Sequence, residues 1–144
     1  MKLELNIDEK VKETLVVVSA NKIDKEVQNL INYIEYSSEY LIGIVEDKAS
    51  IIDIDEIIRV YIEDRKTFVV TAKNTYVVKK KLYEVESMVT RNFIKISQSE
   101  IANIKFIKNL DFSNTGTIVI KYKNSDISYV SRRMIKEFKL KLGI

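Results

Sequence analysis

The sequence predicts an α+β fold in which a mainly antiparallel β body carries a few short helices. From residue 40 onward the spacing of apolar residues changes from a period of about 3.6 to a period of 2, the spacing of a strand with one buried face. The chain also contains three Gly and no Pro, and short polar turns separate runs rich in Ile, Val, Tyr and Thr. Together these features indicate hairpins rather than alternating strands and helices.

The change of period divides the chain into two parts. Residues 1–39 are an N-terminal extension, for which we expect two strands, at residues 3–7 and 14–19, followed by a helix. The helix begins at Asp24, a residue type favoured at the N-cap, and ends near Tyr36. One face of this helix is apolar and consists of Val27, Leu30, Ile31 and Ile34.

Residues 40–144 form the strand-rich body, which is large enough for one core. We expect strands at residues 41–45, 49–54, 57–63, 67–71, 75–79, 93–96, 104–112, 117–122 and 127–130. A helix is predicted over residues 81–89, a helical turn over residues 99–102, and a final helix that begins behind Ser131 and stops at Gly143. Gly116 and Asn124 lie in turns and tolerate positive φ.

Composition removes several classes of function. The chain has no Cys and no His, so thiol nucleophiles, imidazole acid–base chemistry and the usual zinc ligands are absent. We expect a cytoplasmic protein with no membrane insertion, because the first residues lack the apolar region of a signal peptide and no apolar run is long enough to cross a bilayer.

A pair of aspartates is the one acidic motif that could hold a metal. Asp53 and Asp55 are two residues apart on a predicted strand, share a face, and are followed by Glu56. They lack a third well-spaced ligand and a Gly-rich phosphate loop. We therefore expect no metal site, no cofactor and no enzymatic activity.

The charges of the chain are unevenly distributed. Residues 76–144 carry 14 Lys and Arg against 6 Asp and Glu, a net charge of +8, whereas residues 1–75 carry 10 against 15, a net charge of −5. Such a separation creates a positive surface that attracts a polyanion. Nucleic acid is therefore the first partner to consider.

Several spaced blocks of the sequence resemble one known family. FIKISQSEIANI at residues 93–104, the pair Ile107 and Lys108, the hairpin containing Gly116, and YVSRRMIK at residues 129–136 are similar to the LytTR DNA-binding domain. IDEIIRVYIE at residues 54–63 resembles the opening strand of that domain. The resemblance covers residues 40–144 and implies a bacterial transcription regulator with an elongated, mainly antiparallel β fold, which enters DNA grooves with loops and strand ends.

Many members of this family carry a phosphate-receiver domain before the DNA-binding domain. The first 39 residues here are too short for one and lack its alternating strand–helix pattern. They resemble the short extension of stand-alone members. We expect this extension to pack on the β body, to form a dimer contact, or to act as a structural cap.

The first group of candidate DNA-binding residues is Ser97, Gln98 and Ser99. They lie where a predicted strand runs into the predicted helical turn, so that short polar side chains project from one loop. Gln can pair with adenine in the major groove and Ser can donate to phosphate. The resemblance implies a base-contacting role for Gln98. A solvated helix start capped by Ser is the alternative.

The second group is Arg132, Arg133 and Lys136. The two arginines are predicted at the first positions of the final helix, beside free backbone N–H groups and the positive end of the helix dipole, a good site for phosphate. Arg133 aligns with a family position that reaches DNA, and Lys136 lies one turn further on. Without the resemblance, two adjacent arginines are equally consistent with solvated surface charge.

The remaining candidates are Arg65, Lys66 and Lys95. Arg65 and Lys66 fall in a polar turn that corresponds to a second DNA-facing loop of the family, although ion pairs with Glu63 and Asp64 are an alternative role. Lys95 precedes the polar loop and is a candidate phosphate contact.

The resulting hypothesis is a sequence-specific regulator that reads double-stranded promoter DNA, with a homodimer on paired sites. The alternative is a protein-interaction module whose basic face binds an acidic partner. RNA is a weaker possibility, since Tyr122 and Tyr129 fit strand packing as well as base stacking. No residue identifies a regulatory protein partner.

Overall fold

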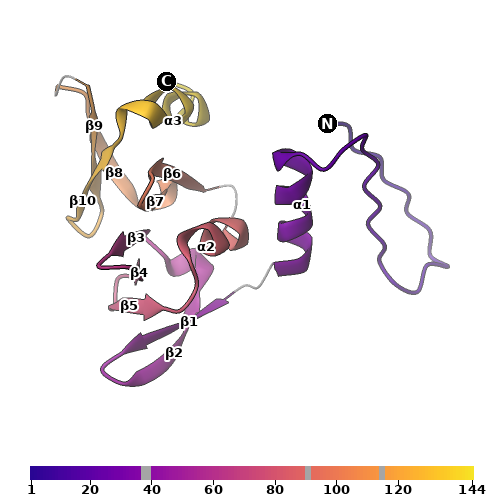
Figure 1. The fold of residues 1–144 in the computed structure, drawn as a ribbon, viewed down its shortest axis with the longest axis horizontal. Helices are drawn as coiled ribbons and strands as arrows, with labels where there is room; N and C mark the ends of the chain where they lie inside the picture. The colour runs from indigo at the N-terminus through magenta and orange to yellow at the C-terminus, as the bar shows by residue number, and fades with distance from the viewer. Residues whose placement is uncertain (37–39, 90–91, 114–115) are drawn as a thin grey trace.

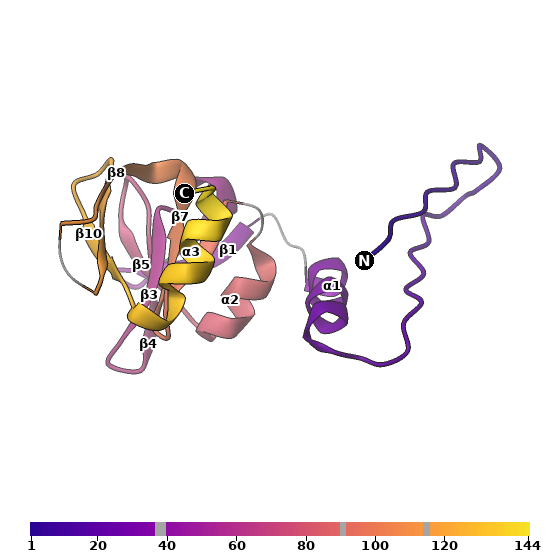
Figure 2. The same cartoon turned by 90° about the horizontal axis from the view of Figure 1, so that it is seen from above.

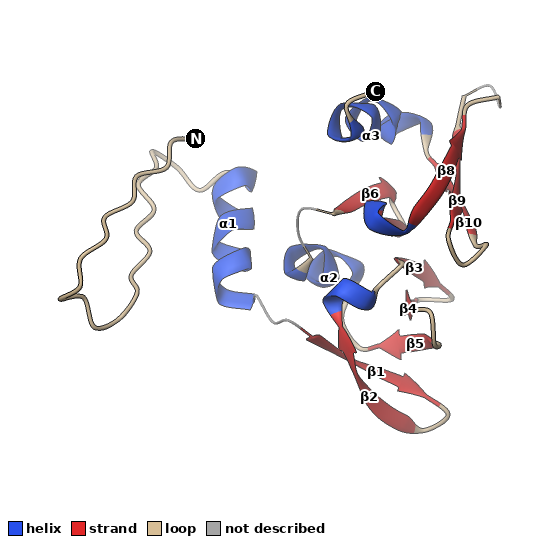
Figure 3. Ribbon diagram, turned by 180° about the vertical axis from the view of Figure 1, so that it is seen from behind, coloured by secondary structure: helices blue, strands red, loops and turns tan. Residues whose placement is uncertain are grey.

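The computed structural model describes all residues except 37–39, 90–91 and 114–115. Its body is strand-rich and antiparallel, with three α-helices, as the sequence predicts (Figures 1 and 3). The helices are α1 (Lys25–Tyr36), α2 (Leu82–Met88) and α3 (Ile135–Leu142). Asp24 caps α1 as predicted, because its carboxylate accepts a hydrogen bond from the Val27 N–H at 2.9 Å.

A seven-stranded sheet forms the centre of the molecule, with the strand order β2-β1-β5-β4-β3-β7-β6. Its strands are β1 (Tyr40–Val45), β2 (Lys48–Asp53), β3 (Arg59–Glu63), β4 (Lys66–Val70), β5 (Thr75–Val78), β6 (Phe93–Ser97) and β7 (Glu100–Asn103). Neighbouring strands are antiparallel. The chain crosses from β2 to β3 through a short 3₁₀ turn, η1 (Ile54–Glu56).

A second sheet of three strands, in the order β10-β9-β8, faces the first. It contains β8 (Ile107–Asp111), β9 (Ile118–Tyr122) and β10 (Ile127–Val130), and is preceded by the 3₁₀ turn η2 (Ile104–Phe106). The turn before β9 uses Gly116 at φ +82°, as predicted. In the β9–β10 turn the residue with positive φ is Ser125, at +74°, and not Asn124, whose side chain instead accepts a hydrogen bond from the Asp126 N–H.

The large sheet separates two apolar cores. On one face α2 packs Leu82, Val85 and Met88 against strand residues such as Val60 and Val69. The other face is covered by the small sheet and α3, whose Phe138 is completely buried. Helix α1 lies on the outer side of α2 (Figure 2). The layers therefore run from α1 through α2 and the large sheet to the small sheet and α3.

Arg59 joins the two sheets through ion pairs. Its Nη1 donates to Glu100 Oε1 on β7 at 2.9 Å, and its Nε donates to Asp126 Oδ2 in the β9–β10 turn at 2.9 Å. Glu100 Oε1 also accepts from the Ser128 hydroxyl at 2.6 Å. Burial opposes the charge, but the hydrogen bonds from both carboxylates raise the pKa of Arg59 above its usual value. The Arg59 guanidinium also lies 4.5 Å from the ring centre of Tyr61.

The predicted helical turn over residues 99–102 is wrong, because Glu100–Asn103 is strand β7. Ile101 belongs to the core under α2 and Ala102 to the core under the small sheet, which is the alternation of a strand buried on both faces. Pairing with β3, about forty residues away in sequence, supplies the backbone partners that a local helical turn would otherwise provide.

The two strands predicted at residues 3–7 and 14–19 are also wrong. These residues are extended and wholly exposed, but they form no ladder (Figure 1). The alternation of polar and apolar residues favours a strand, yet a strand needs partners for its backbone groups, and an isolated hairpin is marginal in water. The apolar side chains of this segment have nothing in their own chain to pack against.

The burial of Phe138 yields a first prediction. Replacing Phe138 with Ala should lower the free energy of unfolding by about 3–5 kcal/mol, because a side chain with 0% exposure leaves a cavity under α3. Urea unfolding measures this change. Leu140→Ala on the same helix, at 72% exposure, is the control and should change stability by less than about 0.5 kcal/mol. Equal effects of the two changes would contradict this packing.

The Arg59 cluster yields a second prediction. Glu100→Gln keeps the shape of the side chain but removes the charge from a carboxylate that is 15% exposed, and it should cost about 1–3 kcal/mol of stability. The exposed Glu137 on α3 provides the matched control, since Glu137→Gln should have almost no effect. A Glu100→Gln protein as stable as the control would show that the ion pairs contribute little.

Candidate nucleic-acid interface

Three turns meet at one edge of the large sheet. Because β7 pairs antiparallel with both β3 and β6, the end of β3, the start of β7 and the end of β6 lie at the same edge. The first two turns are the β3–β4 turn at residues 64–65 and the β6–β7 turn at residues 98–99. The third is the 3₁₀ turn η3 (Arg132–Met134), which follows β10 and leads into α3. In Figure 2 the start of α3 and the β3–β4 hairpin lie on the same side of the molecule.

Two backbone hydrogen bonds hold these turns together. The Ile62 N–H donates to the Ser99 carbonyl at 2.9 Å, which ties the end of β3 to the β6–β7 turn. The Ser131 N–H donates to the Ile96 carbonyl at 2.8 Å, which ties the start of η3 to the end of β6. Backbone bonds of this kind fix the positions of the turns and leave exposed side chains free to contact a ligand.

The β6–β7 turn presents Gln98 to solvent. The Ser97 hydroxyl accepts a hydrogen bond from the Ser99 N–H at 3.2 Å and lies 3.4 Å from the Ser99 hydroxyl. Both hydroxyls therefore help to shape the turn. The Gln98 amide forms no hydrogen bond with the part of the chain that the structure describes. The alternative of a helix start capped by Ser is wrong, because this segment is a hairpin turn between two strands.

The arginines near the C-terminus lie in η3 and not in the first turn of an α-helix as predicted. Ser131 has an extended backbone but makes no side-chain capping bond, and α3 begins only at Ile135. The dipole argument for a phosphate site is accordingly weaker, since three residues of 3₁₀ turn precede the helix. Arg132, Arg133 and Lys136 are all exposed.

Arg132 is in addition the neighbour of a second turn. A Cβ atom on Gly116 would lie 2.8 Å from Arg132 Nε, so the guanidinium packs closely over the turn before β9. This position requires Gly both for its φ of +82° and for the approach of the arginine. The Arg132 side chain is thus held against the small sheet.

Arg65 occupies the tip of a tight two-residue turn. Asp64 and Arg65 have φ of 49° and 65°, the left-handed geometry of a two-residue hairpin turn. Lys66 begins β4 and pairs in register with Glu63. Within the described residues neither Arg65 nor Lys66 has a carboxylate within 4.0 Å, so the alternative of an ion-paired turn is not what this structure contains.

Lys95 lies apart from the three turns. It faces α2, where its ammonium is 4.0 Å from a Glu86 carboxylate oxygen, and it is about one-third exposed. It also lines the space between α1, α2 and α3. The structure therefore brings together the polar turn, Arg65 with Lys66, and the residues of η3 and α3, but it does not bring Lys95 to the same edge.

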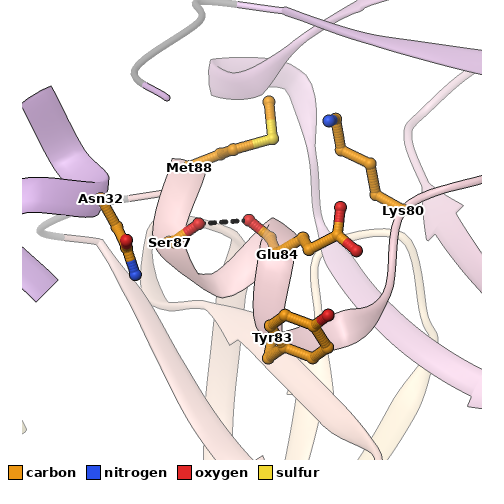
Figure 4. A pocket seen from close by; sticks show the side chains of 6 residues that line it. All are labelled: Asn32, Lys80, Tyr83, Glu84, Ser87 and Met88. Atoms are coloured by element: carbon orange, nitrogen blue, oxygen red, sulfur yellow. Dashed lines mark hydrogen bonds between the residues drawn. The ribbon is translucent and has the colours of Figure 1, made fainter. Parts of the chain in front are cut away.

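A cavity of about 340 Å³ lies between α1 and α2, away from these turns (Figure 4). It is lined by Asn32 of α1 and by Lys80, Tyr83, Glu84, Ser87 and Met88. The Ser87 hydroxyl donates to the Glu84 carbonyl at 2.6 Å, a bond within α2 itself. This hydroxyl is engaged in a local helix contact.

The acidic pair has a structural role. Asp53 Oδ1 accepts a hydrogen bond from the Asp55 N–H at 3.1 Å and caps η1. Among the residues that the structure describes, no three His, Cys, Asp or Glu side chains gather as a group of metal ligands.

Sequence reasoning missed the Arg59 cluster behind the polar turn. Glu100 follows Ser99 directly, so its ion pair with Arg59 anchors the turn to β3. Arg59 stands alone between the buried Ile58 and Val60, and an isolated cation within an apolar strand is a signal for a buried partner. The identity of that partner depends on the β3–β7 pairing, which no local pattern reveals.

Comparisons with known proteins agree with this fold. A family model of the LytTr DNA-binding domain matches residues 47–143. A protein of Staphylococcus aureus strain MSSA476, named as an HTH-type transcriptional regulator, is 32% identical over 146 aligned residues, and one of strain MRSA252 is 31% identical. Each alignment covers 100% of this chain and 99% of the relative, so it includes the N-terminal extension.

A solved structure shows the same fold. It is the LytTr DNA-binding domain of a protein from Bacillus cereus described as a methyl-accepting/DNA response regulator, and it matches with a TM-score of 0.71 and 22% identity. The match covers 74% of this chain and 99% of that domain. No helix in the described residues is long and apolar enough to cross a membrane. From the match over residues 47–143 and the identity over the whole chain, the protein belongs to the LytTR family of DNA-binding domains.

Proposed function

We propose that this protein regulates transcription by reading promoter DNA with the three turns at one edge of its large sheet. The observation that carries the proposal is the pair of backbone hydrogen bonds, Ile62 to Ser99 and Ser131 to Ile96. They place an exposed amide and several exposed cations on a single edge. A surface that combines cations with a polar side chain suits DNA, because phosphate contacts position a protein and base contacts give it specificity.

The proposed roles follow from side-chain chemistry. Gln98 can form two hydrogen bonds with an adenine edge, and Arg133 and Arg65 can reach a guanine edge or a phosphate. Lys66, Arg132 and Lys136 are assigned to phosphates, with Ser97 and Ser99 as further donors. Lys95 is the weakest candidate of the original set, because its ammonium faces Glu86 on the α2 side.

A rigid support favours specificity in this arrangement. The ion pair between Arg59 and Glu100 fixes the residue that follows the polar turn, so the turn does not need to become ordered when DNA binds. Structural support of this kind is what holds recognition groups within reach of their targets. We therefore assign Arg59 and Glu100 a positioning role behind the DNA-contacting turns.

The finer parts of the proposal concern assembly and location. We propose a cytoplasmic protein without enzymatic activity, whose DNA-binding domain spans residues 40–144 and which occupies paired sites as a homodimer. Two linked domains gain affinity through effective concentration even when each binds modestly. A regulatory protein partner would supply the signal that a receiver domain provides elsewhere.

The proposal predicts separable effects of single substitutions on DNA binding. Fluorescence anisotropy should be measured on a duplex selected from a random pool and on a scrambled duplex, across a salt series. Gln98→Ala should reduce the preference for the selected duplex by roughly tenfold, the value of one good base contact. Lys136→Ala should weaken both duplexes and lower the salt slope by about 0.9, the effect of one phosphate contact.

Lys73→Ala is the matched control. Lys73 is exposed in the β4–β5 turn, at the opposite edge of the sheet, and its loss should leave both affinities within about twofold. If Lys73→Ala weakens binding as much as Arg133→Ala, the DNA lies elsewhere. If no duplex is selected even at low salt, a protein-interaction module with an acidic partner replaces this proposal.

A further inference from the structure

The N-terminal segment exposes an unusual amount of apolar surface. Residues 1–20 extend away from the body as two stretches joined by a turn (Figures 1 and 2). The Val11 N–H donates to the Asp8 carbonyl in this turn. Leu3, Leu5 and Ile7 are 80%, 77% and 89% exposed, and the second stretch, residues 15–18, is exposed as well.

The exposed area is close to that of a protein interface. Ten large apolar side chains between residues 1 and 23 are exposed: Met1, Leu3, Leu5, Ile7, Val11, Leu15, Val16, Val17, Val18 and Ile23. At roughly 100 Å² each and about two-thirds exposure they present roughly 700 Å². A standard interface buries about 800 Å² on each partner, whereas scattered single exposures need no explanation.

The sequence of the first stretch is complementary to itself. If two copies of residues 2–8 pair as antiparallel strands about a two-fold axis at Leu5, then Leu5 faces Leu5 and Leu3 faces Ile7. All of these residues share one face of the strand. On the other face Lys2 lies opposite Asp8 of the second copy, so the charges match at both ends of the pairing.

We propose that residues 2–8 of two copies of this chain form this antiparallel pair and thereby join two subunits. The second stretch, residues 14–18, then lies outside the pair, so two hairpins form a four-stranded intermolecular sheet. Three or more strands with an apolar face are what such a structure needs for stability, and one hairpin alone lacks them. The alternation that predicts strands in this segment is thus satisfied between chains.

A membrane surface fits this segment less well. Residues 1–24 carry four Lys against five Asp and Glu, so they have no positive charge to attract anionic lipids. The intramolecular ion pair of Lys2 with Glu4, at 3.3 Å, is fully exposed and does not prevent Lys2 from pairing with a second copy. The inference specifies the segment that forms the homodimer of the proposed function, and its test needs no DNA.

The absence of cysteine from the chain makes the register directly testable, because an introduced cysteine can only cross-link to a second copy. Leu5→Cys places the two sulfur-bearing residues opposite each other, at a Cα separation of about 4.5–5.5 Å that a disulfide spans. Lys2→Cys or Asp8→Cys alone places them roughly 20 Å apart, six residues along the strand. A mixture of these two proteins brings them together again.

Full-length Leu5→Cys should therefore form disulfide dimers at least tenfold faster than Lys2→Cys or Asp8→Cys alone. The mixture of Lys2→Cys and Asp8→Cys should cross-link as fast as Leu5→Cys, with Leu5 intact. Light scattering on the unmodified chain should give the mass of a dimer. Equal cross-linking rates for the three single variants would overturn the pairing, and so would a monomer, including one that sediments with phosphatidylglycerol vesicles.

The outcomes also separate this inference from the proposed function. A monomer that reads DNA selectively overturns the pairing and leaves DNA reading intact. A dimer that cross-links in the expected register but selects no duplex supports the pairing and contradicts the proposed function.

Discussion

Arg59 lies on β3, in the large sheet, and holds one carboxylate from each of the two sheets. Glu100 comes from the strand beside it and Asp126 from a turn of the small sheet. These charges are mostly buried, so each must be paired, and pairing is possible only when the two sheets are stacked in this register. The position of the polar turn follows, because Ser99 is bonded to the residue that pairs with Arg59. The edge that carries the candidate DNA contacts is thus fixed by a cluster that does not itself contact DNA.

This arrangement separates stability from recognition. Apolar side chains on both faces of the large sheet stabilise the fold, and the Arg59 cluster aligns the layers. The turns at the edge are held by backbone hydrogen bonds, so their side chains can change without loss of the core. In the described residues α2 and α3 are separated by five strands, so this surface differs from a helix-turn-helix, in which two consecutive helices form the reader.

Local features of the sequence predicted well and distant pairings did not. Asp24 and Gly143 mark their helix ends because capping depends on a few neighbouring residues. The helical turn at residues 99–102 was wrong because β3 supplies the partners for Glu100 and Ala102 from far along the chain. The strands at residues 3–7 and 14–19 failed for the converse reason, since no partner lies within one chain. The candidate side chains were found from residue type and family resemblance, but their common edge required the order of the strands.

The central claim is that three turns, distant in sequence, form one DNA-reading edge. The most direct measurement is a set of amide NMR spectra of the full-length protein, recorded as a selected duplex is added. The account predicts that the backbone amides of Arg65, Gln98 and Arg133 shift together, while those of the β1–β2 and β4–β5 turns at the opposite edge stay unchanged. Shifts confined to the opposite edge, or to α2, would contradict it.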